Sequence, residues 1–151
     1  MPTVTPFLWF DTQAEEAMNF YASVFKRSKV VSVSRAQGKV MSVQFELEGQ
    51  KFMALNAGPA FKFNESVSFL VGCDTQQEID ELWAKLTVDG GASSQCGWLK
   101  DKFGLSWQIV PKALGQLLGG ADAERSKRVL DVMLQMEKLD LSRLQQAYDA
   151  A

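Results

Sequence analysis

Apolar and polar residues alternate with a period of two along several short segments of the chain. The clearest is VMSVQFELEG at residues 40–49, where Met41, Val43, Phe45 and Leu47 alternate with polar residues before Gly49. This alternation predicts a half-buried strand that ends in a tight turn. Further strands are predicted at residues 7–10, 29–36, 51–57, 67–73, 95–101 and 105–111, with a turn at 89–94 and a hairpin turn at 102–104.

The tripeptide Asp-Thr-Gln occurs twice, at residues 11–13 and 74–76. Each copy carries a Thr-x-x-Glu capping box, Thr12 with Glu15 and Thr75 with Glu78, which predicts the start of a helix. Apolar residues then follow at helical spacing. They are Ala14, Ala17, Met18, Tyr21 and Phe25 in the first copy, and Ile79, Leu82, Trp83 and Leu86 in the second.

Each repeat therefore predicts a strand, an amphipathic helix and further strands, which is an α+β pattern. We expect one domain over residues 1–111, made of two modules at 1–58 and 66–111 with a linker at 59–65. A curved sheet with one apolar face in each module would enclose a cleft between the modules, where we expect a site.

Residues 112–151 have only helical periodicity. Asp122 and Asp140 are placed to cap helices, and Leu139 and Leu144 have the spacing of a hydrophobic staple. A stripe of Val129, Leu130, Met133 and Met136 needs an apolar partner. The helices pack either on the domain itself or across a homodimer, and the pattern leaves both open.

Composition excludes several functional classes. The net charge is −2 with scattered basic residues, so a nucleic-acid partner is not expected. No apolar run is long enough for a membrane span, and the first residues lack a secretory pattern, so we expect no membrane partner and a cytoplasmic location. The chain has no histidine, and in a reducing compartment Cys73 and Cys96 are expected to be buried apolar residues.

Five stretches, occurring in order, resemble the glyoxalase, bleomycin-resistance and dioxygenase superfamily, also called vicinal oxygen chelate, and its PhnB-like branch. They are TPFLWFD with AEEAMNFYASVF, LNAGPAFKFNESVSFLV, CDTQQEIDELWAKL, QCGWLKDKFGLSWQIVP and the tail VLDVMLQMEKLDLSRLQQAY. The resemblance implies two paired βαβββ modules with a C-terminal helical extension, and a homodimer. Many such relatives carry the label demethylubiquinone methyltransferase-like.

In metal-using members of this superfamily, histidine, glutamine or glutamate ligands face into the cleft. The matching positions here offer Thr5, Ala54 or Asn56, Val67 or Ser68, and Gln108, where DKFGLSWQ resembles the family's Asp-Pro-x-Gly-x-x-x-Glu. Neutral side chains supply no charge to offset the dehydration of a divalent ion. We therefore expect neither a metal nor a cofactor.

The function expected first is metal-independent binding of a small organic molecule, aromatic ligands included, in the cleft between the modules. Aromatic side chains would stack on the ligand, and amides and a hydroxyl would orient it. The candidate ligand-binding residues are Trp9, Asn56, Phe63, Ser68, Trp98, Trp107 and Gln108. Each candidate also has a competing structural interpretation. The tryptophans would pack in the core, Asn56 would bond to backbone at a strand end, and the Gln108 amide would be buried and hydrogen-bonded to neighbouring backbone.

Three other interpretations stay open. A metal-free enzyme would use Cys96, Lys100, Asp101 or Tyr21 as acid, base or nucleophile. Methyl transfer is less supported, because the common S-adenosylmethionine fold needs a glycine-rich loop after its first strand and WFDTQAEE has no glycine. A structural dimer without a ligand would have its cleft filled by its own side chains.

Overall fold

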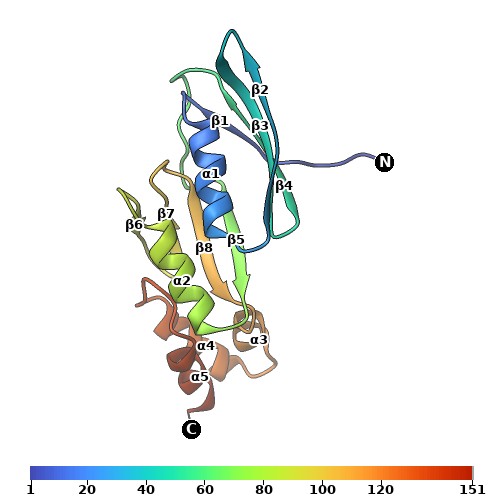
Figure 1. Ribbon diagram of the computed structural model, residues 1–151. Helices are drawn as coiled ribbons and strands as arrows, with labels where there is room; N and C mark the ends of the chain where they lie inside the picture. Colours follow the sequence, from blue (N-terminus) through green and yellow to red (C-terminus); the bar gives the residue numbers. More distant parts are fainter. Residues whose placement is uncertain (151) are drawn as a thin grey trace. The chain divides into compact units, whose positions relative to one another are not determined.

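The structure is a computed structural model that describes residues 1–150, and it contains two compact units, Met1–Lys62 and a second from Phe63 onward. The first unit consists of β1 (Phe7–Phe10), α1 (Ala14–Val24), β2 (Ser28–Ala36), β3 (Lys39–Leu47) and β4 (Gln50–Asn56). Its strands form one sheet in the order β1-β4-β3-β2, with β1 parallel to β4 and the other pairs antiparallel (Figure 1).

One face of α1 forms the core of the first unit with the sheet. Tyr21 is fully buried and stacks on Phe45, with ring centroids 6.2 Å apart, and Phe45 stacks on Phe52 at 5.4 Å. Alternation along β3 is confirmed for Val43, Phe45 and Leu47, which are buried. Met41 is 48% exposed, which corrects the expectation that the whole apolar row is covered.

The second unit repeats this architecture with β5 (Ser68–Cys73), α2 (Gln76–Leu86), β6 (Ala92–Ser93), β7 (Trp98–Lys100) and β8 (Ser106–Pro111). The sheet order is β5-β8-β7-β6, and β5 is parallel to β8. The short strand β6 lies inside the segment expected to be only a turn, because Ala92 and Ser93 pair with Lys100 and Leu99. Both units are therefore βαβββ, which confirms the predicted fold class.

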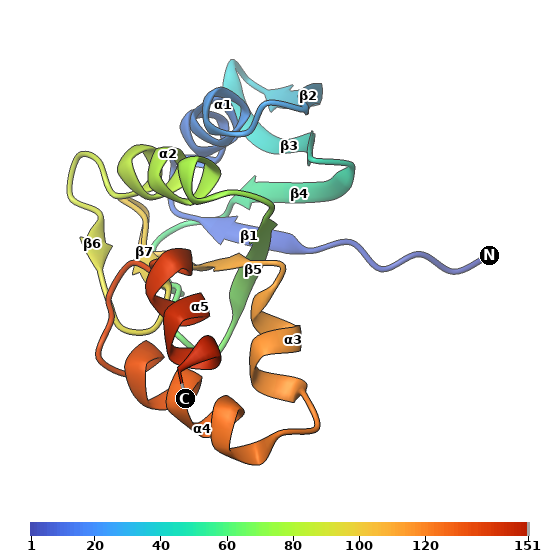
Figure 2. The same cartoon turned by 90° about the horizontal axis from the view of Figure 1, so that it is seen from below.

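Three further helices follow β8: α3 (Leu114–Gly119), α4 (Ala123–Met133) and α5 (Leu141–Asp149). Figure 2 shows α2 on one side of the sheet of the second unit and these helices on the other. The helices enclose an apolar cluster of their own that includes Val110 of β8. Its buried members are Val110, Leu117, Val129, Met136, Leu139 and Leu144. Leu130, expected in the stripe, is 40% exposed.

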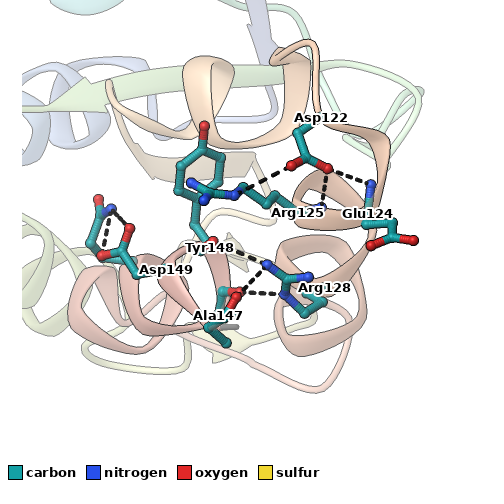
Figure 3. Close-up of polar contacts among 9 residues, drawn as sticks. Asp122, Glu124, Arg125, Arg128, Ala147, Tyr148 and Asp149 are labelled. Carbon is teal, nitrogen blue, oxygen red and sulfur yellow. Dashed lines mark hydrogen bonds and ion pairs between the residues drawn. The ribbon is translucent and has the colours of Figure 1, made fainter.

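Polar contacts fix the ends of the last two helices. The side chains of Asp122 and Asp140 cap α4 and α5, as predicted. Arg128 of α4 donates to the carbonyl oxygens of Ala147 (3.0 Å) and Ala150 (2.7 Å), which satisfies acceptors that the end of α5 leaves without a helical partner (Figure 3). Within residues 1–150, none of the helices has the length and apolar character needed to cross a membrane.

Candidate functional site

Helix α2 covers one face of the sheet of the second unit, and on the other face the side chains range from buried to exposed. Side chains alternate between the two faces of a strand, so Gln108 shares a face with Val110, which packs under the C-terminal helices. Trp107 and Ile109 point to the other face, which α2 covers. We call the face opposite α2 the open face. It carries Ser68, Leu70, Trp98, Lys100, Ser106 and Gln108.

Two predicted residues meet directly on the open face. The side-chain amide nitrogen Nε2 of Gln108 donates a hydrogen bond to the hydroxyl oxygen of Ser68, at 2.9 Å. Trp98 pairs with Gln108 on the adjacent strand and is partly exposed, so its indole lies beside this pair. Leu70 pairs with Gln108 from the other side and is 61% exposed. The structure thus brings Ser68, Trp98 and Gln108 together.

Ser106 is a residue of this face that sequence reasoning missed. It pairs with Ser68 across β5 and β8, is only 1% exposed, and its hydroxyl has no hydrogen-bond partner among residues 1–150. Leaving a buried hydroxyl unbonded costs about 1–3 kcal/mol. The sequence did contain a signal for Ser106, because a residue two positions before Gln108 on the same strand points to the same face.

Trp107 lies on the covered face, away from the other candidates. It is 2% exposed, and its indole nitrogen donates to Oδ2 of Asp101 at 2.9 Å. The other carboxylate oxygen of Asp101 accepts from the backbone N–H groups of Phe103 (2.9 Å) and Leu105 (3.1 Å). Asp101 therefore organises the hairpin loop between β7 and β8 from a buried position, and Trp107 packs in the core.

The basic residue of the open face is matched by an acid. Lys100 forms an ion pair with Glu65, and the hydrogen bond from this lysine, together with its charge, lowers the pKa of the Glu65 carboxyl. Both side chains are about half exposed, so the pair contributes little to stability. Its effect on the face is to neutralise the charge that Lys100 would otherwise present to a ligand.

The first unit holds two candidates, and they lie on opposite faces of its sheet. Trp9 donates from its indole nitrogen to the carbonyl of Gly58 at 2.9 Å and meets Phe61 edge to face, with centroids 4.9 Å apart. Asn56 lies on the α1 side. Its Oδ1 accepts from the N–H of Ala14 at 2.9 Å, and its Nδ2 donates to the carbonyl of Val40 at 3.2 Å. Phe63, at the start of the second unit, is partly exposed.

Two residues of the enzyme interpretation have structural roles, Tyr21 in the buried core of the first unit and Asp101 in the hairpin loop. Of the two cysteines, Cys73 is buried as expected, and desolvation by burial, reinforced by the nearby charges of Glu78 and Asp74, raises the pKa of its thiol to about 11. Such a thiol is protonated at neutral pH and is a weak nucleophile. The expectation that Cys96 is buried is wrong, because this residue occupies a turn with φ +58° and is partly exposed.

The open face is a poor match for a divalent metal ion. Its own potential donors are the neutral oxygens of Ser68, Ser106 and Gln108, and the Ser68 oxygen already accepts a hydrogen bond from Gln108. The one carboxylate beside the face, that of Glu65, is paired with Lys100. Mg²⁺, Ca²⁺ and Mn²⁺ sites rely on carboxylate oxygens to offset dehydration. Among residues 1–150, no group of three or more His, Cys, Asp or Glu side chains is arranged to hold a metal.

Comparison with known proteins agrees with this architecture. The model of the family described as 3-demethylubiquinone-9 3-methyltransferase matches residues 2–110. The PhnB protein from Bacillus cereus is 38% identical, and the alignment covers 72% of this chain and 99% of that chain with a TM-score of 0.67. A comparison with curated proteins finds no match.

Two more distant structures share the fold. A glyoxalase/bleomycin resistance protein from Albidiferax ferrireducens is 10% identical, covering 71% of this chain and 95% of that one with a TM-score of 0.51. The fosfomycin resistance protein FosX from Listeria monocytogenes, solved with Mn(II) and sulfate, is 12% identical, covering 78% and 95% with a TM-score of 0.55. The predicted resemblance is confirmed: the chain belongs to the 3-demethylubiquinone-9 3-methyltransferase family, together with PhnB, and has the glyoxalase/bleomycin-resistance fold.

Proposed function

We propose that this protein binds a small, uncharged, planar organic molecule on the open face of its second sheet, without a metal ion. The observation that carries the proposal is the Ser106 hydroxyl, 1% exposed and without a partner among the described residues, next to the bonded Ser68–Gln108 pair. A carbonyl or hydroxyl group of a ligand would give Ser106 the bond that residues 1–150 do not supply.

The neighbouring groups favour an uncharged ligand. Gln108 donates to the Ser68 oxygen, which leaves the Ser68 hydroxyl hydrogen available to a ligand acceptor. Lys100 is neutralised by Glu65, so the face presents hydroxyl and amide groups without a net charge. Trp98 offers an aromatic surface for stacking and Leu70 an exposed apolar one.

Methyl transfer, the activity in the family description, is not the function that we propose. The connection between β1 and α1 is Asp11-Thr12-Gln13, and that between β5 and α2 is Asp74-Thr75, so neither strand-to-helix turn contains a glycine. A backbone approach to the cofactor in the common S-adenosylmethionine fold depends on such glycines. Calorimetry with S-adenosylmethionine is the direct test, and we expect no binding heat.

The test of ligand binding compares the variant Ser106→Ala with the control Ser94→Ala, which changes an exposed serine of the same unit. The probe is benzamide, an uncharged aromatic carbonyl compound, with benzoate as its charged counterpart. By calorimetry, benzamide should bind the wild type more tightly than benzoate does. Ser106→Ala should weaken benzamide binding about five- to tenfold, the size expected for one lost hydrogen bond.

Stability measured on the same variants separates binding from folding. Ser106→Ala removes an unbonded buried hydroxyl, so the free energy of unfolding should be unchanged or raised while benzamide affinity falls. Ser94→Ala should change neither quantity. Tighter binding of benzoate than of benzamide, or equal benzamide affinity in wild type and Ser106→Ala, would refute the proposal.

A further inference from the structure

The segment that joins α4 to α5 returns to the second unit immediately before Trp98. The backbone N–H groups of Cys96 and Gly97 donate to the carbonyl oxygens of Met136 (2.8 Å) and Glu137 (2.7 Å). Cys96 and Gly97 both have positive φ, +58° and +86°, as residues of a turn. These two hydrogen bonds attach the turn before Trp98 to residues 136–137.

A glutamine of α2 holds the same segment from a second direction. The side-chain nitrogen of Gln76 donates to the carbonyl of Leu139 at 3.0 Å, and its side-chain oxygen accepts from the N–H of Leu141 at 2.8 Å. One amide thus bonds both a backbone acceptor and a backbone donor, as a neighbouring strand would. An ion pair between Lys138 and Asp80, 2.8 Å long, adds a contact on the surface.

Close packing leaves this junction little freedom. A Cβ atom on Gly97 would lie 3.0 Å from the carbonyl oxygen of Ile109 and 3.1 Å from the side chain of Leu139. Leu139 is fully buried in the cluster that covers Val110, which follows Gln108 by two residues on the same strand face. Because β7 and β8 are antiparallel, Gly97 and Val110 lie on the same side of the Trp98–Gln108 pair, and the segment contacts the sheet on that side.

We propose that residues 136–141 form one wall of the candidate ligand face and that Gln76 is a positioning residue for Trp98, acting through this segment. The inference rests on the proposed function for its ligand, whereas the position of Trp98 can be measured without one. The segment lies outside residues 2–110, which match the family. Residues 136–141 bound the open face at Val110 and so limit how far a ligand extends along β8.

The experiment compares Gln76→Leu with Gln77→Leu. Gln77 is the adjacent glutamine, is exposed, and bonds to Glu81 on its own helix at 3.2 Å. Two measurements use the free protein: hydrogen exchange of the Cys96 and Gly97 amides, and the ¹H–¹⁵N signal of the Trp98 indole, assigned with Trp98→Phe. The third is the benzamide dissociation constant.

We expect Gln76→Leu to accelerate amide exchange at Cys96 and Gly97 at least tenfold, to shift the Trp98 indole signal and to weaken benzamide binding at least threefold. Gln77→Leu should leave all three unchanged. If Gln76→Leu does not fold, Gln76→Glu serves instead, because it keeps the acceptor for Leu141 and loses the donor to Leu139 and to Asp80.

The outcomes separate this inference from the proposed function. An unmoved Trp98 indole signal in a folded Gln76 variant overturns the positioning role, even if amide exchange rises. A shifted indole signal with unchanged benzamide affinity overturns the role of the segment as a ligand wall. A shifted indole signal in a protein that binds no benzamide supports the positioning of Trp98 and counts against the proposed function alone.

Discussion

The two copies of Asp-Thr-Gln begin their helices in different ways. In the second copy Thr75 caps α2, and its hydroxyl oxygen accepts from the N–H of Glu78 at 3.2 Å. In the first copy Gln13 rather than Thr12 precedes α1, no side chain of that position caps the helix, and Asn56 from β4 accepts from the N–H of Ala14. The capping box predicted for Thr12 and Glu15 is therefore wrong.

The physical reason lies in the strand that neighbours the start of each helix. By strand pairing, Phe10 is opposite Asn56 in the first unit, and Cys73 is opposite Pro111 in the second. Asn56 has an amide that reaches the helix start, whereas proline has no side-chain donor or acceptor. Equal motifs thus lead to different caps because the partner strand differs.

The glutamines of the two copies have diverged as well. Gln13 is exposed at the start of α1, whereas Gln76 bonds to Leu139 and Leu141 and holds the C-terminal extension. A repeated motif thus preserves the fold of both units but not the role of each residue. In the second unit the motif has a second task, which is to attach a segment that the family match does not include.

Asn56→Ala should be the most damaging change at either helix start. It leaves the N–H of Ala14 and the carbonyl of Val40 without their partner, and we expect it to destabilise the protein by about 2–3 kcal/mol. Urea unfolding measures this loss. Asn64→Ala, in an exposed turn, is the control and should cost less than about 1 kcal/mol. An equal loss of unfolding free energy in the two variants would contradict the role of Asn56 as the cap of α1.

Thr75→Ala and Thr12→Ala form the matched pair that tests the caps directly. Thr75→Ala should cost about 1 kcal/mol, the usual loss for a helix cap, and Thr12→Ala should cost nearly nothing. The measurement is again the free energy of unfolding in urea. A loss at Thr12 as large as that at Thr75 would restore the symmetric capping box and contradict the structure.

The smallest effect concerns pH and the ion pair beside Gln76. Hydrogen bonds from Lys138 and then Gln76 lower the pKa of the Asp80 carboxyl. Because this pKa is lowered, the ionised Asp80 carboxylate stabilises the folded protein above about pH 3.9, the pKa of an unfolded aspartate. That stabilisation is lost as the pH falls through the lower pKa of the folded state. The stability difference between wild type and Asp80→Asn should therefore shrink as pH falls below about 4. Because the pair is exposed, the effect is small. A difference that grows on acidification would reverse the assigned sign.

Sequence patterns predicted most of the fold because alternation and helical spacing are local signals. They located the longer strands of both sheets, and missed β6 because two residues are too few to show a period. The cores around Tyr21 and Ile79 followed from helical spacing. The exposure of Met41 and Leu130 did not follow from the spacing. Periodic spacing shows which side chains share a face of an element, but not how much of that face the neighbouring element covers.

The site was predictable only in part. Ser68, Trp98 and Gln108 follow from the resemblance and the strand period, and the structure places them on one face. The covered position of Trp107 could have been predicted, because adjacent residues of a strand point to opposite faces and Trp107 directly precedes Gln108. The unbonded state of Ser106 and the attachment of residues 136–141 depend on contacts between distant segments, which no local pattern carries.

The most direct test of the central claim is a titration of ¹⁵N-labelled protein with benzamide, followed by NMR. We expect the Trp98 indole signal and the backbone amides of Ser106 and Gln108 to shift together and to saturate in the wild type. Ser106→Ala should need about five- to tenfold more benzamide for the same shift. Saturating shifts confined to other parts of the chain, or none at all, would contradict it.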